Sequence, residues 1–152
     1  PMIARWPGHI GAGKVTDHLS AQWDVLPTVL ELVGAAETIP TNIDGISFAP
    51  TLLAEGSQAT HDVMYWELGR QQAVRAGNWK LYRSGNADGE IDTVELFNLR
   101  DDPGEETNLA GEQLDLLNEM VQLAQRSREP SVLFPSVFDS ETVVPPGDET
   151  SR

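Results

Sequence analysis

The alternation of hydrophobic and polar positions divides the chain into a helical first part and a strand-rich second part. Residues 2–6 form a short apolar run that predicts a strand, ended by a Pro-Gly pair. A helix is predicted from Asp24 as N-cap, with Pro27 in its first turn and Gly34 after its end. The apolar stripe of this helix consists of Leu26, Val29, Leu30 and Val33. Residues 50–53 predict a second, shorter helix or turn.

From residue 63 onward the apolar positions follow the period of two that is typical of strands. The predicted strands are 63–68, 73–76, 79–83 and 94–99. Gly77 and Asn78 join the second and third as a tight hairpin, because both residue types accept positive φ. A helix is predicted over 112–126. Its apolar face consists of Leu114, Leu117, Val121 and Ala124.

This order of elements predicts an α+β chain with two architectural parts. Residues 1–56 are interpreted as the end of an α/β layer. Residues 57–129 are interpreted as a small antiparallel sheet packed on one helix, and residues 130–152 as an extended tail that wraps a surface or frays. No internal repeat is present.

Charge and composition exclude several classes of partner. The 152 residues carry a formal charge of −14, and 16 of the 24 acidic residues lie in residues 84–152. Nucleic acid and anionic membrane are therefore disfavoured, because phosphate contacts need clustered cations. No apolar run is long enough to cross a bilayer or to form a secretion signal. A chain that opens on proline is expected to be a piece of a longer protein, from which targeting information has been removed.

Candidate chemical groups are few. His9, His18 and His61 are too far apart in sequence for a local metal-binding pattern, so each is interpreted as a loop or surface residue. Asp101 and Asp102 form an acidic pair, but a Pro-Gly pair follows them at once, which favours a capped turn over a cation site. With no cysteine, the chain has no disulfide and no thiolate ligand.

Aromatic residues gather in the predicted sheet. Trp66, Trp79 and Tyr82 are interpreted as packing anchors of the sheet, and the alternative is a platform for a carbohydrate or aryl group. The polar stretch 84–92 is either a solvent-exposed loop or a substrate-selecting one.

Several short motifs, in order along the chain, resemble one family. Residues 4–10 (Ala-Arg-Trp-Pro-Gly-His-Ile) and 24–34 (Asp-Val-Leu-Pro-Thr-Val-Leu-Glu-Leu-Val-Gly) resemble the late part of the sulfatase catalytic domain. The later matching pieces are 44–47 (Asp-Gly-Ile-Ser), 65–67, 73–81, 95–99, and 101–105 through to Asn108 and Leu109. Each piece is weak alone, but together they are collinear over residues 1–110.

The resemblance implies a catalytic domain of the alkaline-phosphatase type, followed by a subdomain with a four-stranded antiparallel sheet and one packed helix. It also implies a formylglycine made from Cys or Ser, a calcium ion held by Asp and Asn, and Lys, His and Arg around the sulfate. This chain has no cysteine and no serine in the Ser-x-Pro/Ala-x-Arg context. The chain is therefore expected to contain no catalytic or metal-binding residue and to be inactive alone, the formylglycine and calcium belonging to the parent enzyme.

The partners implied by the resemblance are a missing N-terminal catalytic domain and an aryl sulfate or sulfated carbohydrate. Most such enzymes are exported to a periplasm, lysosome or extracellular space, which the sequence itself does not test. Because residues 1–56 lack the sheet they would pack on, self-association or a partly mobile first half is expected. The candidate residues for a substrate rim are His18, Trp66, Glu67, Arg75, Asn86 and Asp88. The alternatives are an acidic binding or structural module derived from a sulfatase, and part of a related phosphatase or phosphodiesterase.

Overall fold

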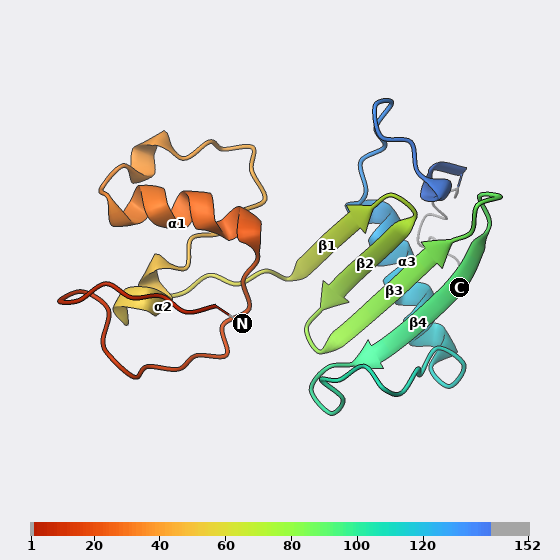
Figure 1. The fold of residues 1–152 in the computed structure, drawn as a ribbon, viewed down its shortest axis with the longest axis horizontal. Helices are drawn as coiled ribbons and strands as arrows, with labels where there is room; N and C mark the ends of the chain where they lie inside the picture. Colours follow the sequence, from red (N-terminus) through yellow and green to blue (C-terminus); the bar gives the residue numbers. More distant parts are fainter. Residues whose placement is uncertain (1, 141–152) are drawn as a thin grey trace, which may run out of the picture. The chain divides into compact units, whose positions relative to one another are not determined.

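A computed structural model describes residues 2–140 and divides the chain into two compact units, Pro1–His61 and Asp62–Arg152 (Figure 1). The first unit holds two helices and two 3-10 turns joined by long loops. These elements are η1 (Gln22–Asp24), α1 (Val25–Leu32), η2 (Ala36–Thr38) and α2 (Ala49–Leu53). The predicted strand over residues 2–6 is wrong, since this segment is irregular. A strand needs a neighbour for its backbone hydrogen bonds, and none of the four strands pairs with it.

Helix α1 buries a different face from the one its apolar stripe predicts. The helix ends before Gly34, which takes the expected positive φ of 74°. Leu26 is 52% exposed, Val29 49% and Val33 69%, whereas Pro27 and Thr28 are buried. The reason is a polar link. The Thr28 hydroxyl donates to the Asp24 carbonyl (2.6 Å) and accepts from the amide of Phe48 (3.0 Å), which ties the segment before α2 to the other side of the helix.

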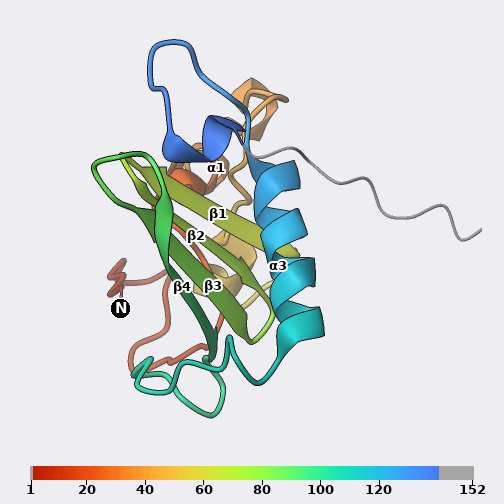
Figure 2. The ribbon, with the colours of Figure 1, turned by 90° about the vertical axis from the view of Figure 1, so that its right-hand side faces the viewer.

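The second unit is a four-stranded antiparallel sheet covered on one face by a helix (Figures 1 and 2). Its strands are β1 (Val63–Leu68), β2 (Gln71–Ala76), β3 (Trp79–Gly85) and β4 (Ile91–Asn98), in the order β1-β2-β3-β4. The covering helix is α3 (Leu114–Ser127). The predicted four-stranded antiparallel sheet packed on one helix is confirmed.

The hairpin between β2 and β3 is as tight as predicted, because Ala76 pairs with Trp79 and leaves a two-residue turn. Gly77 has a φ of 56°, but among the described residues positive φ outside glycine occurs only at Ala54 and Glu105. Asn78 therefore does not adopt the positive φ that was expected of it. Glycine first and a residue of negative φ second is typical of a type II′ turn.

The core lies between the sheet and α3. Its buried residues are Val74, Leu81, Leu96, Met120 and Ala124, with Trp79 packed against them. Because side chains alternate along a strand, Trp66 and Tyr82 point to the opposite side of the sheet. Trp79 is thus a packing anchor as predicted, and the other two aromatic residues do not face this core. On α3, Leu114 is 62% exposed, so the buried face is centred on Met120 and Ala124 instead.

The loop after β4 is a network of capped turns. The carboxylate of Asp102 accepts from the amides of Glu106 (3.1 Å) and Thr107 (2.9 Å). The side-chain oxygen of Asn108 accepts from the amides of Leu96 (3.1 Å) and Ala110 (2.9 Å). The interpretation of the acidic pair as a capped turn is confirmed for Asp102, because both of its oxygens are used by the loop backbone.

After α3 the chain folds back over one end of the sheet. A loop leads to η3 (Val137–Ser140), whose Phe138 is buried, with the Arg83 guanidinium 4.9 Å from the centre of its ring. Residues 141–152 of the predicted tail lie outside the described residues. Within residues 2–140, no helix has both the length and the apolar character that a membrane span requires.

Candidate functional site

A polar cluster occupies the end of the sheet where β1 turns into β2, on the side that faces α3. Six side chains form it: Tyr65, Glu67, Gln72, Arg83, Arg128 and Asp139. The alternation of strands explains the first four, since Tyr65 and Glu67 share a face of β1 with the core, and Glu67 pairs with Gln72, which pairs with Arg83. Arg128 and Asp139 come from the segment that follows α3.

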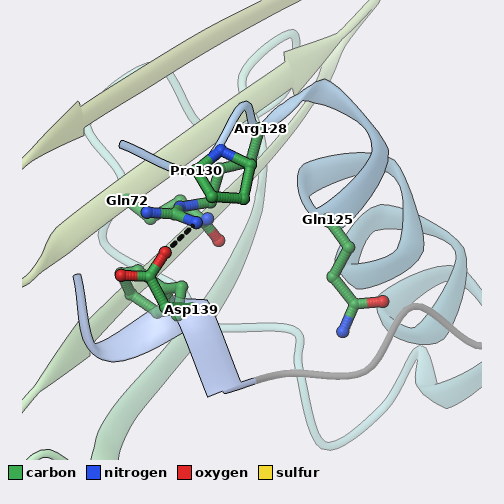
Figure 3. Close-up of a pocket in the computed structure, with 6 residues that line it drawn as sticks. Gln72, Gln125, Arg128, Pro130 and Asp139 are labelled. Carbon is green, nitrogen blue, oxygen red and sulfur yellow. Dashed lines mark hydrogen bonds and ion pairs between the residues drawn. The ribbon is translucent and has the colours of Figure 1, made fainter. Parts of the chain in front are cut away.

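Arg128 joins three parts of the unit. Its Nε donates to Oε2 of Glu67 at 2.7 Å and its Nη2 to Oε1 of the same carboxylate at 3.3 Å. Its Nη1 donates to Oδ1 of Asp139 at 2.6 Å, as Figure 3 shows. The second oxygen of Asp139 accepts from the Ser136 amide at 2.7 Å. One guanidinium therefore connects the end of α3, strand β1 and the η3 segment.

The rest of the polar cluster passes from strand to strand. Tyr65 donates its hydroxyl hydrogen to Glu67, and Gln72 Nε2 donates to the Tyr65 oxygen at 2.9 Å. Arg83 donates to Oε1 of Gln72 through Nε at 3.0 Å and through Nη2 at 2.5 Å. A series of side-chain hydrogen bonds of this kind gives each polar group a partner, so that none is buried unpaired at this end of the sheet.

Electrostatics hold the polar cluster in one protonation state. Burial alone would raise the pKa of Glu67, but hydrogen bonds from Arg128 and Tyr65 lower it below its usual value. The pKa of Asp139 is lowered by the Ser136 amide and by Arg128. Burial and the Glu67 carboxylate raise the pKa of Tyr65 well above its usual value, so the phenol stays neutral and acts as a donor. Both carboxylates of the polar cluster pair with Arg128, and Arg83 donates to the Gln72 side chain.

The cavity beside this cluster is too small for a sugar. It has a volume of about 60 Å³ and is lined by Gln72, Gln125, Arg128, Pro130, Phe138 and Asp139 (Figure 3). Such a space holds a few water molecules at most. A second, wider pocket of about 620 Å³ is lined in part by Glu67 and Arg128. Its remaining lining is Tyr65, Leu68, Gly69, Glu129, Ser131, Leu133, Phe134 and Pro135.

Acid should weaken the polar cluster. Because the pKa values of Glu67 and Asp139 are lowered in the fold, both carboxylates stabilise it above their unfolded pKa, and this contribution is lost as pH falls through the folded values. We expect Glu67→Gln to lower the melting temperature at pH 7, and the difference from wild type to shrink as pH falls from 7 to below the ordinary glutamate pKa of about 4.3. Thermal unfolding followed by circular dichroism checks this. A difference that is constant over that range would contradict it.

The predicted rim residues do not meet in one place. Glu67 belongs to the polar cluster, whereas Trp66 and Arg75 lie on the face of the sheet opposite α3. Asn86 caps the turn between β3 and β4, since its Oδ1 accepts from the amides of Asp88 (2.9 Å) and Glu90 (3.0 Å). Asp88 is exposed in that turn.

His18 lies in the first unit, in a loop, where its amide donates to the Thr16 hydroxyl at 3.1 Å. No catalytic constellation is formed by these candidates within residues 2–140. Their roles as a substrate rim stay a prediction.

A second polar centre, in the first unit, was missed by sequence reasoning. The buried carboxylate of Asp24 makes no capping bond to α1. It accepts instead from the amides of Ala21 (2.7 Å) and Ile46 (2.8 Å) and contacts Nε2 of His61 at 2.8 Å. Of the two interpretations of His61, a loop or a surface residue, the structure supports the loop, and its side chain is only 9% exposed. Gly45 is required beside this centre because a Cβ there would lie 2.3 Å from the Trp23 carbonyl oxygen.

The described residues do not fit the calcium site that the sulfatase resemblance implies. Within residues 2–140, no three His, Asp or Glu side chains come together as ligands for a metal ion. Asp24 is the best-buried carboxylate, but its oxygens are already used by two amides and a histidine. The chemistry of both polar centres is that of structural ties.

Comparison with known proteins gives one consistent result. A family model described as "N-sulphoglucosamine sulphohydrolase, C-terminal" matches residues 1–129. Arylsulfatase A of Bos taurus is 31% identical over 163 residues, covering 92% of this chain and 31% of that protein. N-acetylgalactosamine-6-sulfatase of Mus musculus is 35% identical over 82 residues, covering 54% of this chain and 16% of that protein.

A solved structure shares the fold. It is that of BT4656 in complex with its substrate D-glucosamine-2-N,6-O-disulfate, with 27% identity and a TM-score of 0.63 over 81% of this chain and 26% of that chain. The chain thus spans a third or less of the length of these three relatives.

Proposed function

Because the chain belongs to the sulfatase family, through that family's C-terminal region, we propose that it is the C-terminal part of a sulfuric ester hydrolase. The proposed substrates are sulfated carbohydrates or aryl sulfates. The observation that carries the proposal is the match of the family model to residues 1–129, which includes both compact units. The relatives' names support the substrate class, since they include arylsulfatase A and N-acetylgalactosamine-6-sulfatase.

In this proposal the chain contributes scaffold and one wall of the substrate cleft, and the reacting groups come from polypeptide outside it. Hydrolysis of a sulfate ester needs a nucleophile, a cation near the developing charge and an acid for the leaving oxygen. The chain has no cysteine, and the part that the structure describes holds no group of metal ligands. A formylglycine and a calcium ion would both be supplied by the preceding catalytic domain.

The exposed apolar stripe of α1 supports a partner for the first unit. Leu26, Val29 and Val33 follow one another at helical spacing and are each about half exposed or more. A stripe of this kind on a soluble protein marks a surface that another part of the assembly covers. The preceding catalytic domain is the proposed partner, and self-association of the chain is the expected result when that domain is missing.

Two measurements test the proposal. The coding sequence upstream of Pro1 should encode Cys-x-Pro-x-Arg or Ser-x-Ala-x-Arg together with paired aspartates. The polypeptide that includes it should release sulfate from a sulfated sugar or aryl sulfate, while the 152-residue chain alone should release none. An unrelated upstream domain would favour a binding module instead. Sulfate release by the purified chain alone would overturn the assignment of catalysis to the preceding domain.

A further inference from the structure

The face of the sheet opposite α3, here the far face, breaks an ordinary rule of strand pairing. Arg75 on β2 lies directly opposite Lys80 on β3. Like charges opposite each other in an antiparallel pair repel and destabilise the sheet. Lys80 is compensated, since its Nζ lies 2.7 Å and 2.6 Å from the two carboxylate oxygens of Glu105. A like-charge pair lowers the stability of a sheet, and where one of its charges has no neighbouring carboxylate, that charge is often retained because it binds a ligand.

Arg75 is the uncompensated member of the pair. Its Nε donates to the Gly77 carbonyl at 3.1 Å, within its own hairpin. Among the described residues it forms no ion pair, unlike Arg128 and Lys80. Its guanidinium therefore has donors left for an anion from outside the unit, and a guanidinium fork matches the oxygens of a sulfate or carboxylate.

An aromatic row lies next to this cation on the same face. Trp66, Ala73 and Tyr82 are direct partners across β1, β2 and β3, and Glu95 on β4 continues the row. The row is two residues along the strand from the Arg75–Lys80 pair, or about 7 Å. Because strands are spaced about 4.8 Å apart, Trp66 and Tyr82 stand about 10 Å apart with only a methyl group between them. Ala73 is therefore the only side chain that separates the two aromatic side chains in this row.

The groups on the far face match the parts of a sulfated sugar. Aromatic faces pack on the apolar C–H side of a pyranose ring, a guanidinium binds the sulfate, and a carboxylate accepts hydrogen bonds from hydroxyl groups. We infer that the far face of the sheet is a non-catalytic binding site for a sulfated saccharide unit, with Arg75 on the sulfate and Tyr82 and Trp66 on the ring. This inference rests on the proposed function and adds a surface that binds the same class of ligand.

Charge complementarity favours a sulfated sugar over a plain one. The chain carries a formal charge of −14, so an anionic ligand is repelled by the molecule as a whole and needs a local cation to bind. Arg75 supplies that cation, whereas the Arg128 guanidinium of the polar cluster is already paired with two carboxylates. An unsulfated sugar would use only the aromatic row, and inorganic sulfate would use only the Arg75 end of the site.

A titration followed by ¹H–¹⁵N NMR on the 152-residue chain tests the inference. The three probes are N-acetylgalactosamine 6-sulfate, unsulfated N-acetylgalactosamine and inorganic sulfate, at matched ionic strength. The sulfated sugar should shift the signals of Trp66, Ala73, Arg75 and Tyr82 and bind at least tenfold more tightly than either other probe. Arg75→Gln and Tyr82→Leu should each weaken its binding roughly tenfold, the loss typical of a charge-assisted hydrogen bond or a buried aromatic contact.

Arg100→Gln is the matched control, because Arg100 is an exposed arginine in the turn after β4 and should leave binding unchanged. The melting temperature of Arg75→Gln should be equal to or above that of wild type, since the substitution removes a repulsion. Equal binding of inorganic sulfate and the sulfated sugar would overturn the saccharide site, as would shifts away from the far face or no shifts at all. If the chain binds the sugar but the longer polypeptide releases no sulfate, the proposed function fails and this site stands.

Discussion

Replacing Asp24 with alanine is expected to lower the free energy of unfolding of the first unit by about 3 kcal/mol. The carboxylate is 1% exposed and accepts from the amides of Ala21 and Ile46 while it contacts His61. Alanine would leave two inward-facing amides and an imidazole without their partner. The buried groups that remain, rather than the lost bonds themselves, account for most of the cost.

The measurement is urea unfolding followed by circular dichroism and by hydrogen exchange at the Ile46 amide, which should lose its protection first. Asp24→Asn keeps one carbonyl oxygen and should fall between wild type and Asp24→Ala. Asp44→Ala is the matched control, since Asp44 is an exposed aspartate that stands two residues before Ile46. If Asp24→Ala unfolds at the same urea concentration as Asp44→Ala, the tie between the start of α1 and residues 44–61 contributes nothing.

The elements of the second unit were predictable because their signals are local. Alternation of apolar and polar residues located all four strands, and β1 has the predicted bounds, Val63–Leu68. The 3.6-residue period located α3 to within two residues. The pairing of the strands adds which side chains lie next to each other across the sheet, which the alternation along one strand does not show. The alternation that puts Leu81 in the core also turns Arg83 inward, so the position of Arg83 in the polar cluster could have been read from β3 alone.

The errors lie where distant segments meet. Asp24 looks like a helix cap because the sequence next to it begins a helix, but its partners Ile46 and His61 are 22 and 37 residues away. The apolar stripe of α1 is a real pattern, but its side chains stay largely exposed, and the helix packs through Thr28 instead. Likewise, Arg128 reads as a charge at a helix end, and only the fold brings it to Glu67, 61 residues away.

The second large effect is expected from Arg128→Met, which should lower the stability of the second unit by about 2 kcal/mol through the loss of the Glu67 bonds. Arg128 is 7% exposed and Glu67 19%, so the pair is shielded from water more than a surface ion pair is. Methionine fills a similar volume without the charge and leaves Glu67 with the hydroxyl groups of Tyr65 and Ser136 as its side-chain donors. The bond to Asp139 is lost too, so η3 loses its tie to the end of α3.

This loss should be visible as faster proteolysis and hydrogen exchange over residues 129–139, at a temperature where β2 and β3 stay protected. Arg126→Met is the matched control, because Arg126 is an exposed arginine one half-turn earlier on the same helix. A double-mutant cycle with Glu67→Gln isolates the pair, since the two substitutions together should cost less than the sum of each alone. Two outcomes would contradict this role of Arg128: stability losses of the two single variants that simply add in the double variant, or an Arg126→Met variant that exposes residues 129–139 equally. In either case the packing of Phe138, and not the Arg128 guanidinium, holds the end of the sheet together.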